Sequence, residues 1–310
     1  MTTVITVPQS LDDHTVESVF EQVAQAPADG RLLIDARHAT WSSPFGLASL
    51  LCLGQVVGDR ASFAVPEASD TVSYWARAGF FKHAGELFEL VGSVPRSREN
   101  RPSDVLLELT PIVRADDVHA VVGRIQDRAQ EILQGQLHLE GKATVGFAMT
   151  LSEICQNIVE HAGRGGWVAV QSYSYRRRLA GRRVVQLAVC DAGMGFRGSL
   201  DASPIARRDD RWDDAAALGA AMLRAVSRFG DPGRGHGLAG VRRWVGRWEG
   251  KMSIRSGTAR MLIQPNPSWE PEPPLVERLA PFPGAQVQIT IPERVGIDTP
   301  RSERAVASRR

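Results

Sequence analysis

The pattern of apolar and polar residues in the first 91 positions alternates between two types. Short runs of adjacent apolar residues predict strands, and apolar residues three or four apart predict helices. The predicted strands are Val4–Val7, Leu32–Asp35 and Ala61–Val65. The predicted helices are Thr15–Ala26, Ser42–Val57, which has Pro44 in its first turn, and Val72–Ala78. This alternation predicts a compact α/β domain over residues 1–91, with helices packed on a sheet.

A polar stretch with several prolines and glycines, residues 92–103, interrupts the pattern and predicts a linker. The pattern then resumes and predicts a second domain over residues 104–292. The predicted helices of this domain are Val118–Leu133, Ser152–His161, Asp213–Phe229 and Ala239–Trp248. The predicted strands are Val105–Leu109, Trp167–Tyr175, Val184–Cys190, either Met252–Arg255 or Arg260–Ile263, and Val287–Ile291.

Two further segments carry no periodic pattern. Residues 264–283 are rich in proline and predict an exposed insertion or docking loop. Residues 293–310 are polar and basic, and we expect a disordered tail there.

Composition places the chain among globular proteins. Its 310 residues suffice for two domains, and 43% of them are hydrophobic. The formal net charge of +2 gives no reason to expect a nucleic-acid partner. Cys52, Cys155 and Cys190 lie in apolar stretches, which favours reduced, buried thiols over a disulfide or zinc framework. Met1–Val7 does not resemble a signal peptide, and no apolar run approaches the ~20 residues that span a bilayer. We therefore expect a cytoplasmic protein without a membrane span.

The central helix, residues 152–161, carries the first candidate chemistry. Glu153, Asn157 and His161 are spaced four residues apart and are expected to share one helix face. An asparagine oxygen can coordinate Mg²⁺, and a glutamate can accept a proton from water or a hydroxyl group. Taken alone, this spacing also describes an ordinary amphipathic helix with a solvated face.

A second candidate is the turn that follows the strand ending at Cys190. Asp191 can accept a hydrogen bond from the exocyclic amine of adenine, while Gly193 and Gly195 leave room for the ring. A single Asp-x-Gly-x-Gly sequence also describes many ordinary turns.

The third candidate is a glycine-rich loop before the predicted helix 239–248. Gly233, Gly235 and Gly237 alternate with Arg234 and His236, so successive amides can face an anion near a helix start. No Lys-Ser/Thr pair follows, which excludes a Walker A loop. No strand precedes the helix, which excludes a dinucleotide-binding fingerprint.

Together the three stretches resemble the GHKL ATPase superfamily, which includes gyrase, the ninety-kilodalton heat-shock chaperones, histidine kinases and MutL. Glu153 and Asn157 match its N-box, and the Asp191 and Gly233 stretches match its two glycine boxes. The resemblance implies a two-layer α/β sandwich that binds ATP and Mg²⁺. It assigns ATP or metal contacts to Asn157, Asp191, Gly193, Gly195, Gly233, Gly235, His236, Gly237 and Leu238, and the role of catalytic base to Glu153.

Two departures from the GHKL pattern stand out. Ala285 occupies the position at which a threonine usually supports the adenine-binding acid. The interval between the glycine boxes, residues 196–232, is long. In the superfamily this interval is the lid over ATP, so we expect either a gated lid or a packed extra helix.

The first domain resembles a STAS domain, the fold of anti-sigma-factor antagonists. The resemblance rests on Leu32–Ala36 followed by Trp41–Leu47. Pro44 and Phe45 stand where that family has its serines, while Ser42 and Ser43 are displaced. We therefore favour a structural or protein-docking module over a phosphoserine switch.

Two other features have ordinary explanations. His119 lacks the acid and proline that follow the phosphorylated histidine of histidine kinases, so we expect a solvated helix residue. The five arginines among residues 176–183 can contact phosphates or lipid headgroups, but a solvated turn is the commoner role.

The apolar side of the helix 118–133 can pack on the second domain or form a homodimer.

The two resemblances imply a cytoplasmic regulatory protein that binds ATP and has Mg²⁺-dependent ATPase or serine kinase activity of the anti-sigma-factor type. A sigma factor or a STAS protein is the expected partner. The alternative is a non-catalytic ATP sensor or interaction switch, and a third is an interaction protein with a vestigial ATP site.

Overall fold

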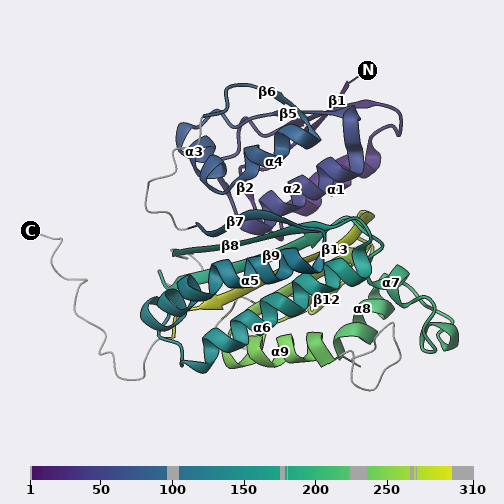
Figure 1. Ribbon diagram of the computed structural model, residues 1–310. Helices are drawn as coiled ribbons and strands as arrows, with labels where there is room; N and C mark the ends of the chain where they lie inside the picture. Colours follow the sequence, from purple (N-terminus) through teal and green to yellow (C-terminus); the bar gives the residue numbers. More distant parts are fainter. Residues whose placement is uncertain are drawn as a thin grey trace, which may run out of the picture.

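The computed structural model describes residues 2–95, 105–174, 179, 181–223, 236–265, 269 and 271–294. It confirms a mixed α/β protein built around two large sheets (Figure 1). We call residues 2–95 the N-terminal unit and residues 105–294 the C-terminal unit. Among the described helices, none is long and apolar enough to cross a membrane.

The N-terminal unit is organised on a parallel sheet with the strand order β1-β3-β5-β6. These strands are β1 (Thr2–Thr6), β3 (Arg31–Asp35), β5 (Ala61–Ala64) and β6 (Glu89–Val91). The helices are α1 (Val16–Gln25), α2 (Pro44–Val57), α3 (Ser69–Arg77) and α4 (Phe80–Leu87), with a 3₁₀ turn at Gly58–Arg60. A short parallel pair joins β2 (Ser10–Leu11) to β4 (Trp41–Ser42). The predicted strands and helices are confirmed to within a few residues, whereas α4 and the short strands were not predicted.

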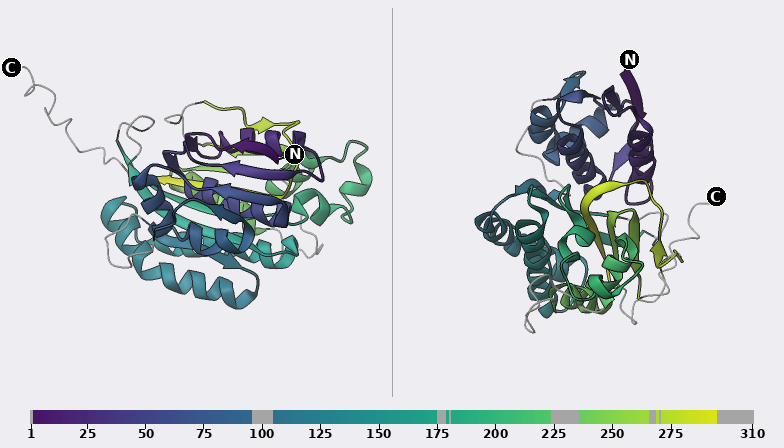
Figure 2. Two further views of the ribbon diagram at one scale, coloured as in Figure 1. Left: turned by 90° about the horizontal axis from the view of Figure 1, so that it is seen from above. Right: turned by 90° about the vertical axis from the view of Figure 1, so that its right-hand side faces the viewer.

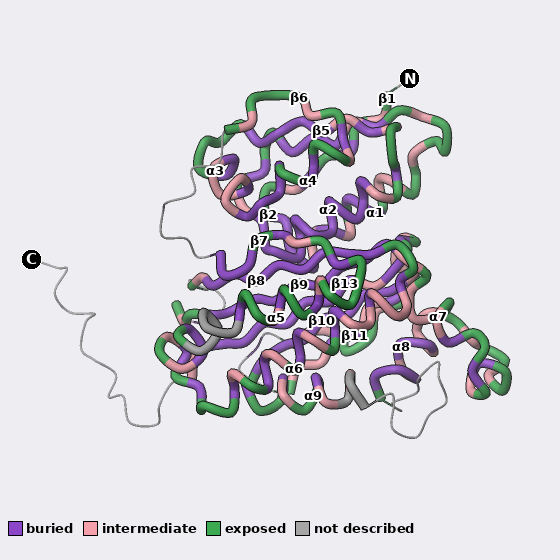
Figure 3. The backbone as a smooth tube through the Cα atoms, viewed as in Figure 1, coloured by how far each residue is buried: buried purple, intermediate pink, exposed green. Residues whose placement is uncertain are grey.

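Helix α2 carries apolar residues on all of its sides. Pro44 occupies the first turn, and the Ser43 hydroxyl caps the helix by accepting the Gly46 amide at 3.1 Å. Ser42, which we predicted to be helical, lies instead in β4. Almost the whole helix is buried (Figure 3), because the N-terminal sheet lies on one side and the C-terminal sheet on the other.

The C-terminal unit contains an antiparallel sheet with the strand order β12-β11-β10-β13-β9-β8-β7. The strands are β7 (Val105–Ile112), β8 (Gly166–Ser174), β9 (Arg183–Asp191), β10 (Lys251–Gly257), β11 (Ala259–Ile263), β12 (Leu275–Val276) and β13 (Phe282–Pro292). Both alternatives for the strand near residue 255 are therefore present, as the hairpin β10–β11. β12 lies within the predicted proline-rich insertion and pairs with β11.

Helices cover one face of this sheet (Figure 1). They are α5 (Ala115–Gln130), α6 (Lys142–Asn157), α7 (Gly195–Leu200), α8 (Asp214–Leu223) and α9 (His236–Arg247). Two π-helical segments, η2 (Glu131–Gln136) and η3 (Ile158–Ala162), follow α5 and α6, and a 3₁₀ turn, η4, spans Ala206–Arg208. The described part of the predicted helix 213–229 is α8. Most of the predicted linker and nearly all of the predicted tail lie outside the described residues.

The central helix differs from its prediction at both ends. α6 begins ten residues earlier than the predicted stretch, at Lys142, and its α-helical part ends at Asn157. His161 lies in the π-helical segment η3. A π turn holds more residues than an α turn, so His161 follows Asn157 in a different helical geometry from the predicted one.

The two units share one continuous core (Figure 2). α2 packs on β8, β9 and β13, and a single cluster of buried residues joins α2 with Trp167, Ala169, Ala188 and Cys190. The Ser49 hydroxyl lies 4.0 Å from the Cys190 thiol. The N-terminal unit therefore covers the second face of the C-terminal sheet.

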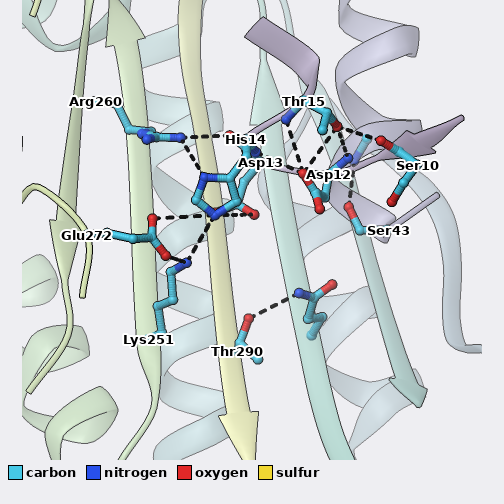
Figure 4. A network of polar contacts seen from close by, with 12 residues as sticks. Ser10, Asp12, Asp13, His14, Thr15, Ser43, Lys251, Arg260, Glu272 and Thr290 are labelled. Atoms are coloured by element: carbon cyan, nitrogen blue, oxygen red, sulfur yellow. Dashed lines mark hydrogen bonds and ion pairs between the residues drawn. The ribbon is translucent and has the colours of Figure 1, made fainter. Parts of the chain in front are cut away.

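A cluster of polar side chains also joins the units, between the segment after β2 and the β10–β11 hairpin (Figure 4). Arg260 donates to the Asp13 carbonyl oxygen at 3.0 Å. His14 Nε2 lies 3.4 Å from the Glu272 carboxylate, which also pairs with Lys251. Glu272 belongs to the proline-rich segment, so this part of the predicted docking loop contacts the N-terminal unit of its own chain.

Candidate functional site

Asp191 ends β9, and its carboxylate is the most perturbed acid of the candidate site. The side chain is buried, and Oδ1 accepts the Gly193 amide at 2.8 Å. Burial raises the pKa of Asp191 to about 6, although hydrogen bonds from the Gly193 and Ala285 amides act in the opposite direction. Asp191 is therefore a buried acceptor whose charge is maintained by backbone donors.

The glycines beside Asp191 allow three backbone segments to meet. A Cβ on Gly193 would lie 2.1 Å from the Ala162 carbonyl oxygen, at the end of η3. Gly284 has φ +82°, and a Cβ there would lie 2.1 Å from the Asp191 carbonyl oxygen. Close backbone approach is thus a reason for these glycines in addition to the predicted space for a ring.

Glu153 and Asn157 lie one turn apart at the end of α6, where Glu153 is exposed and Asn157 is half-buried. Partial desolvation of its carboxylate raises the pKa of Glu153, and the negative charge of Glu160 adds to this shift. A carboxylate with a raised pKa is a better proton acceptor than an ordinary one, which suits the predicted role of base.

The structure brings the end of this helical region against the first glycine turn. Ala162 contacts Gly193, and the His161 ring lies 3.2 Å from the Ser199 hydroxyl of α7. Gly166, the first residue of β8, pairs directly with Asp191. Two of the three predicted stretches therefore meet in space.

The second glycine box is described only in part. Gly233 and Gly235 lie outside the described residues, as does the side chain of His236. α9 begins at His236, three residues before the predicted start at Ala239, so the second half of the box belongs to the helix itself. Leu238 packs on the core between α9 and the helices α7 and α8.

The sequence singled out Ala285 for the threonine side chain that it lacks, yet its backbone amide donates to the Asp191 carboxylate. Sequence reasoning missed Gln286 and Ser256. Gln286 Nε2 donates to the Asp191 carbonyl oxygen at 2.9 Å. Ser256 accepts the Phe196 amide at 3.0 Å and donates to the Gly284 carbonyl oxygen at 2.9 Å. Gly284 follows a proline at the start of the closing strand, which was the only local signal of this arrangement.

The described part of the predicted lid, residues 196–223, is packed rather than extended. Leu200 of α7 forms a small core with Ala220 and Ala221 of α8. The Asp214 carboxylate, at the start of α8, accepts the amide and hydroxyl of Thr258 at 2.8 Å. This geometry matches the packed-helix alternative for residues 196–223, while residues 224–235 lie outside the described part.

The serines of the STAS-like stretch are not available to a kinase in this structure. Ser42 and Ser43 are both fully buried. The Ser42 hydroxyl donates to the Ser43 carbonyl oxygen at 3.0 Å, while Ser43 caps α2. These contacts agree with a structural role for both serines.

Metal ligation by a dense acidic cluster finds no support. Among the described residues, no group of three or more His, Cys, Asp or Glu side chains is placed to hold an ion. The surface depression lined by Arg208, Asp209, Asp210 and Arg211 contains none of the predicted site residues.

Comparison of the chain with models of protein families, with curated proteins and with solved structures found no match. The functional proposals below therefore depend on the motifs and on the geometry of this chain.

Proposed function

We propose that the protein binds ATP at the junction of β9, the end of α6 and the start of α9. The observation that carries this proposal is the buried Asp191 carboxylate, held by two backbone amides beside a glycine turn that touches Ala162, at the end of the π-helical segment that follows Asn157. In this proposal Asp191 accepts the adenine amine, and Gly193 and Gly195 border the ring. The amides around Gly235–Leu238 hold the phosphates.

Magnesium is the proposed metal, and Asn157 is its proposed ligand. Mg²⁺ takes oxygen ligands and keeps several waters when it is held by one or two protein groups and by phosphates. One carboxamide at a partly exposed helix end fits that donor set. When bound, Mg²⁺ neutralises phosphate charge.

Glu153 is the proposed base for phosphoryl transfer. Its raised pKa allows it to accept a proton from an attacking water, which gives ATP hydrolysis. The same position allows it to accept a proton from a seryl hydroxyl of a partner protein, as in anti-sigma serine kinases. We place the protein in the cytoplasm, with a sigma factor or a STAS protein as the partner.

A non-catalytic ATP sensor is a second candidate function, and one observation favours it. α2 packs directly on the strand that ends at Asp191, so the nucleotide site and the N-terminal unit share a core. Binding at Asp191 can then bias the interface between the units without turnover.

The test is calorimetry of ATP binding with Mg²⁺, with phosphate release followed in the same samples. We expect wild type to bind and Asp191→Asn to lose at least about tenfold in affinity, since a hydrogen bond to a charged group is worth ~1.5–3 kcal/mol. The exposed Asp210 provides the control substitution, Asp210→Asn, with unchanged affinity. Absence of ATP binding by wild type would refute the proposal.

Glu153→Gln then separates the two candidate functions. As a catalytic base, Glu153 is needed for phosphoryl transfer but not for binding, so the variant binds ATP and releases little phosphate. If wild type binds ATP, releases no phosphate and transfers none to a serine of a STAS protein, the sensor is the correct function.

A further inference from the structure

A buried arginine of the C-terminal sheet is paired with a glutamate of the N-terminal unit. Arg255 of β10 is only 1% exposed. Its Nε lies 2.9 Å from Oε1 of Glu17, and its Nη2 lies 3.2 Å from Oε2. This two-pronged geometry is the strongest arrangement of an arginine with a carboxylate, and its partner comes from α1.

The remaining contacts of Arg255 fix the guanidinium in place. Nη1 donates to the Gly257 carbonyl oxygen at 3.0 Å, and Nη2 donates to the Ala280 carbonyl oxygen. The guanidinium carbon lies 4.8 Å from the centre of the Phe20 ring, which stacks on Phe282. The loop before β13, the end of β10 and α1 therefore meet at one side chain.

The neighbouring residue, Ser256, continues this contact to the glycine turn. Its hydroxyl accepts the Phe196 amide and donates to the Gly284 carbonyl oxygen. Gly195 has φ +67°, and a Cβ there would lie 2.6 Å from the Ser256 hydroxyl. A shift of β10 at Arg255 thus displaces the first residues of α7.

Gly284 completes the connection to Asp191. A Cβ on Gly284 would lie 2.6 Å from Oδ1 of Asp191, so the two residues are in direct contact. Arg255 and Ser256 pair in register with Gln286 and Ala285 of β13, and the register shifts only after Ser256. Gly284 lies next to this irregularity, where the side-chain contacts of Arg255 and Ser256 add to the strand pairing.

We propose that Glu17 of the N-terminal unit is a positioning residue for the nucleotide site, and that it acts through Arg255, Ser256 and Gly284 on the turn beside Asp191. This inference rests on the proposed function. Nucleotide affinity then depends on the contact between α1 and β10. Because coupling between two sites is reciprocal, bound ATP in turn stabilises that contact.

The test compares two glutamate-to-glutamine variants of the full chain. Glu17→Gln removes the charge that Arg255 pairs with. Glu272→Gln makes the same chemical change in the other polar cluster between the units, where Glu272 pairs with Lys251 and His14 rather than with Arg255. Glu21→Gln is the surface control on α1, because Glu21 is exposed. The measurements are the ATP dissociation constant and backbone hydrogen exchange over residues 193–200 without nucleotide.

We expect Glu17→Gln to weaken ATP binding at least about fivefold, the lower end of ordinary coupling between sites. We also expect it to speed exchange over residues 193–200, while phosphate release at saturating ATP stays as in wild type. Glu272→Gln and Glu21→Gln should leave both measurements unchanged. If Glu17→Gln folds poorly, Glu17→Asp keeps the charge and shortens the reach, with the same direction of effect.

Unchanged affinity and unchanged exchange in Glu17→Gln would overturn the inference. Equal effects in Glu17→Gln and Glu272→Gln would also overturn it, because they would indicate general loosening of the interface. If wild type binds no ATP, the proposed function fails, and the exchange comparison still decides whether Glu17 positions the turn.

Discussion

The two faces of the C-terminal sheet are both buried, yet they are built from different residues. On the face toward α5, α6 and α9, the strands β9 and β13 present Val185, Leu187, Val189, Val287, Ile289 and Ile291. On the face toward the N-terminal unit, the same strands present Gln186, Ala188, Cys190, Gln286, Gln288 and Thr290. The first face is an apolar core, while the second is largely polar.

The polar face shows what kind of interface the N-terminal unit makes. Gln186 donates to the Thr290 hydroxyl at 3.2 Å, whereas the carboxamide oxygens of Gln286 and Gln288 have no hydrogen-bond partner among the described residues. A buried acceptor without a partner costs about 1–3 kcal/mol. Residues of this kind normally face water on one side of an antiparallel sheet. On β9 and β13, the face toward the N-terminal unit is therefore less apolar than the face toward the helices, although Ala188 and Cys190 still join the core shared with α2.

Neighbouring residues of β13 test this difference most directly. Ile289→Ala should lower the free energy of unfolding by about 4 kcal/mol, because it empties space in the apolar core. Gln288→Ala, one residue away on the other face, should change it by less than about 1 kcal/mol, since removal of an acceptor that lacks a partner offsets the loss of packing. Urea denaturation followed by tryptophan fluorescence measures both, and equal losses would show that the two faces contribute alike.

The Glu17–Arg255 pair sharpens the comparison at a buried ionic contact between the two units. Arg255→Met should cost about 3 kcal/mol, because it leaves the Glu17 carboxylate with little solvent and no guanidinium partner. Adding Glu17→Met should recover most of that loss, since two apolar side chains can replace a buried ion pair. Thermal unfolding of the single and double variants measures the recovery. A double variant as unstable as the single one would contradict this account.

An effect smaller than the Ile289→Ala and Arg255→Met losses is a pH dependence that comes from Asp191. Its pKa is about 6 in the folded chain against an ordinary 3.8, so between these values the folded state holds a proton that the unfolded chain has released. The contribution of Asp191 to stability therefore rises as pH falls from about 6 to about 4, by on the order of 2 kcal/mol.

Asp191→Asn removes this titration, so the difference in unfolding free energy between wild type and variant should change over that pH window. His83 acts with the opposite sign in both proteins, because burial lowers its pKa and its protonation favours the unfolded chain. It therefore cancels in the comparison. A constant difference between pH 4 and 7 would contradict the assignment to Asp191.

Local pattern predicted much of the secondary structure because strand and helix periods are properties of neighbouring residues. The helices α1 and α2, the strands β3, β9 and β13, and the strand-end position of Asp191 were all predicted in this way. The π-helical end of α6 was not, because it depends on packing against α7 and on the contact of Ala162 with Gly193.

The sequence by itself determined where each candidate residue lies along its strand or helix. Only the tertiary structure decided that a polar sheet face is buried, that Ser256 supports the glycine turn, and that Glu17 pairs with Arg255. The two residues of that pair are 238 positions apart, and no local period relates them. Contacts of this kind arise when separate sheets pack together, because buried charges and amides must then find partners from distant segments of the chain.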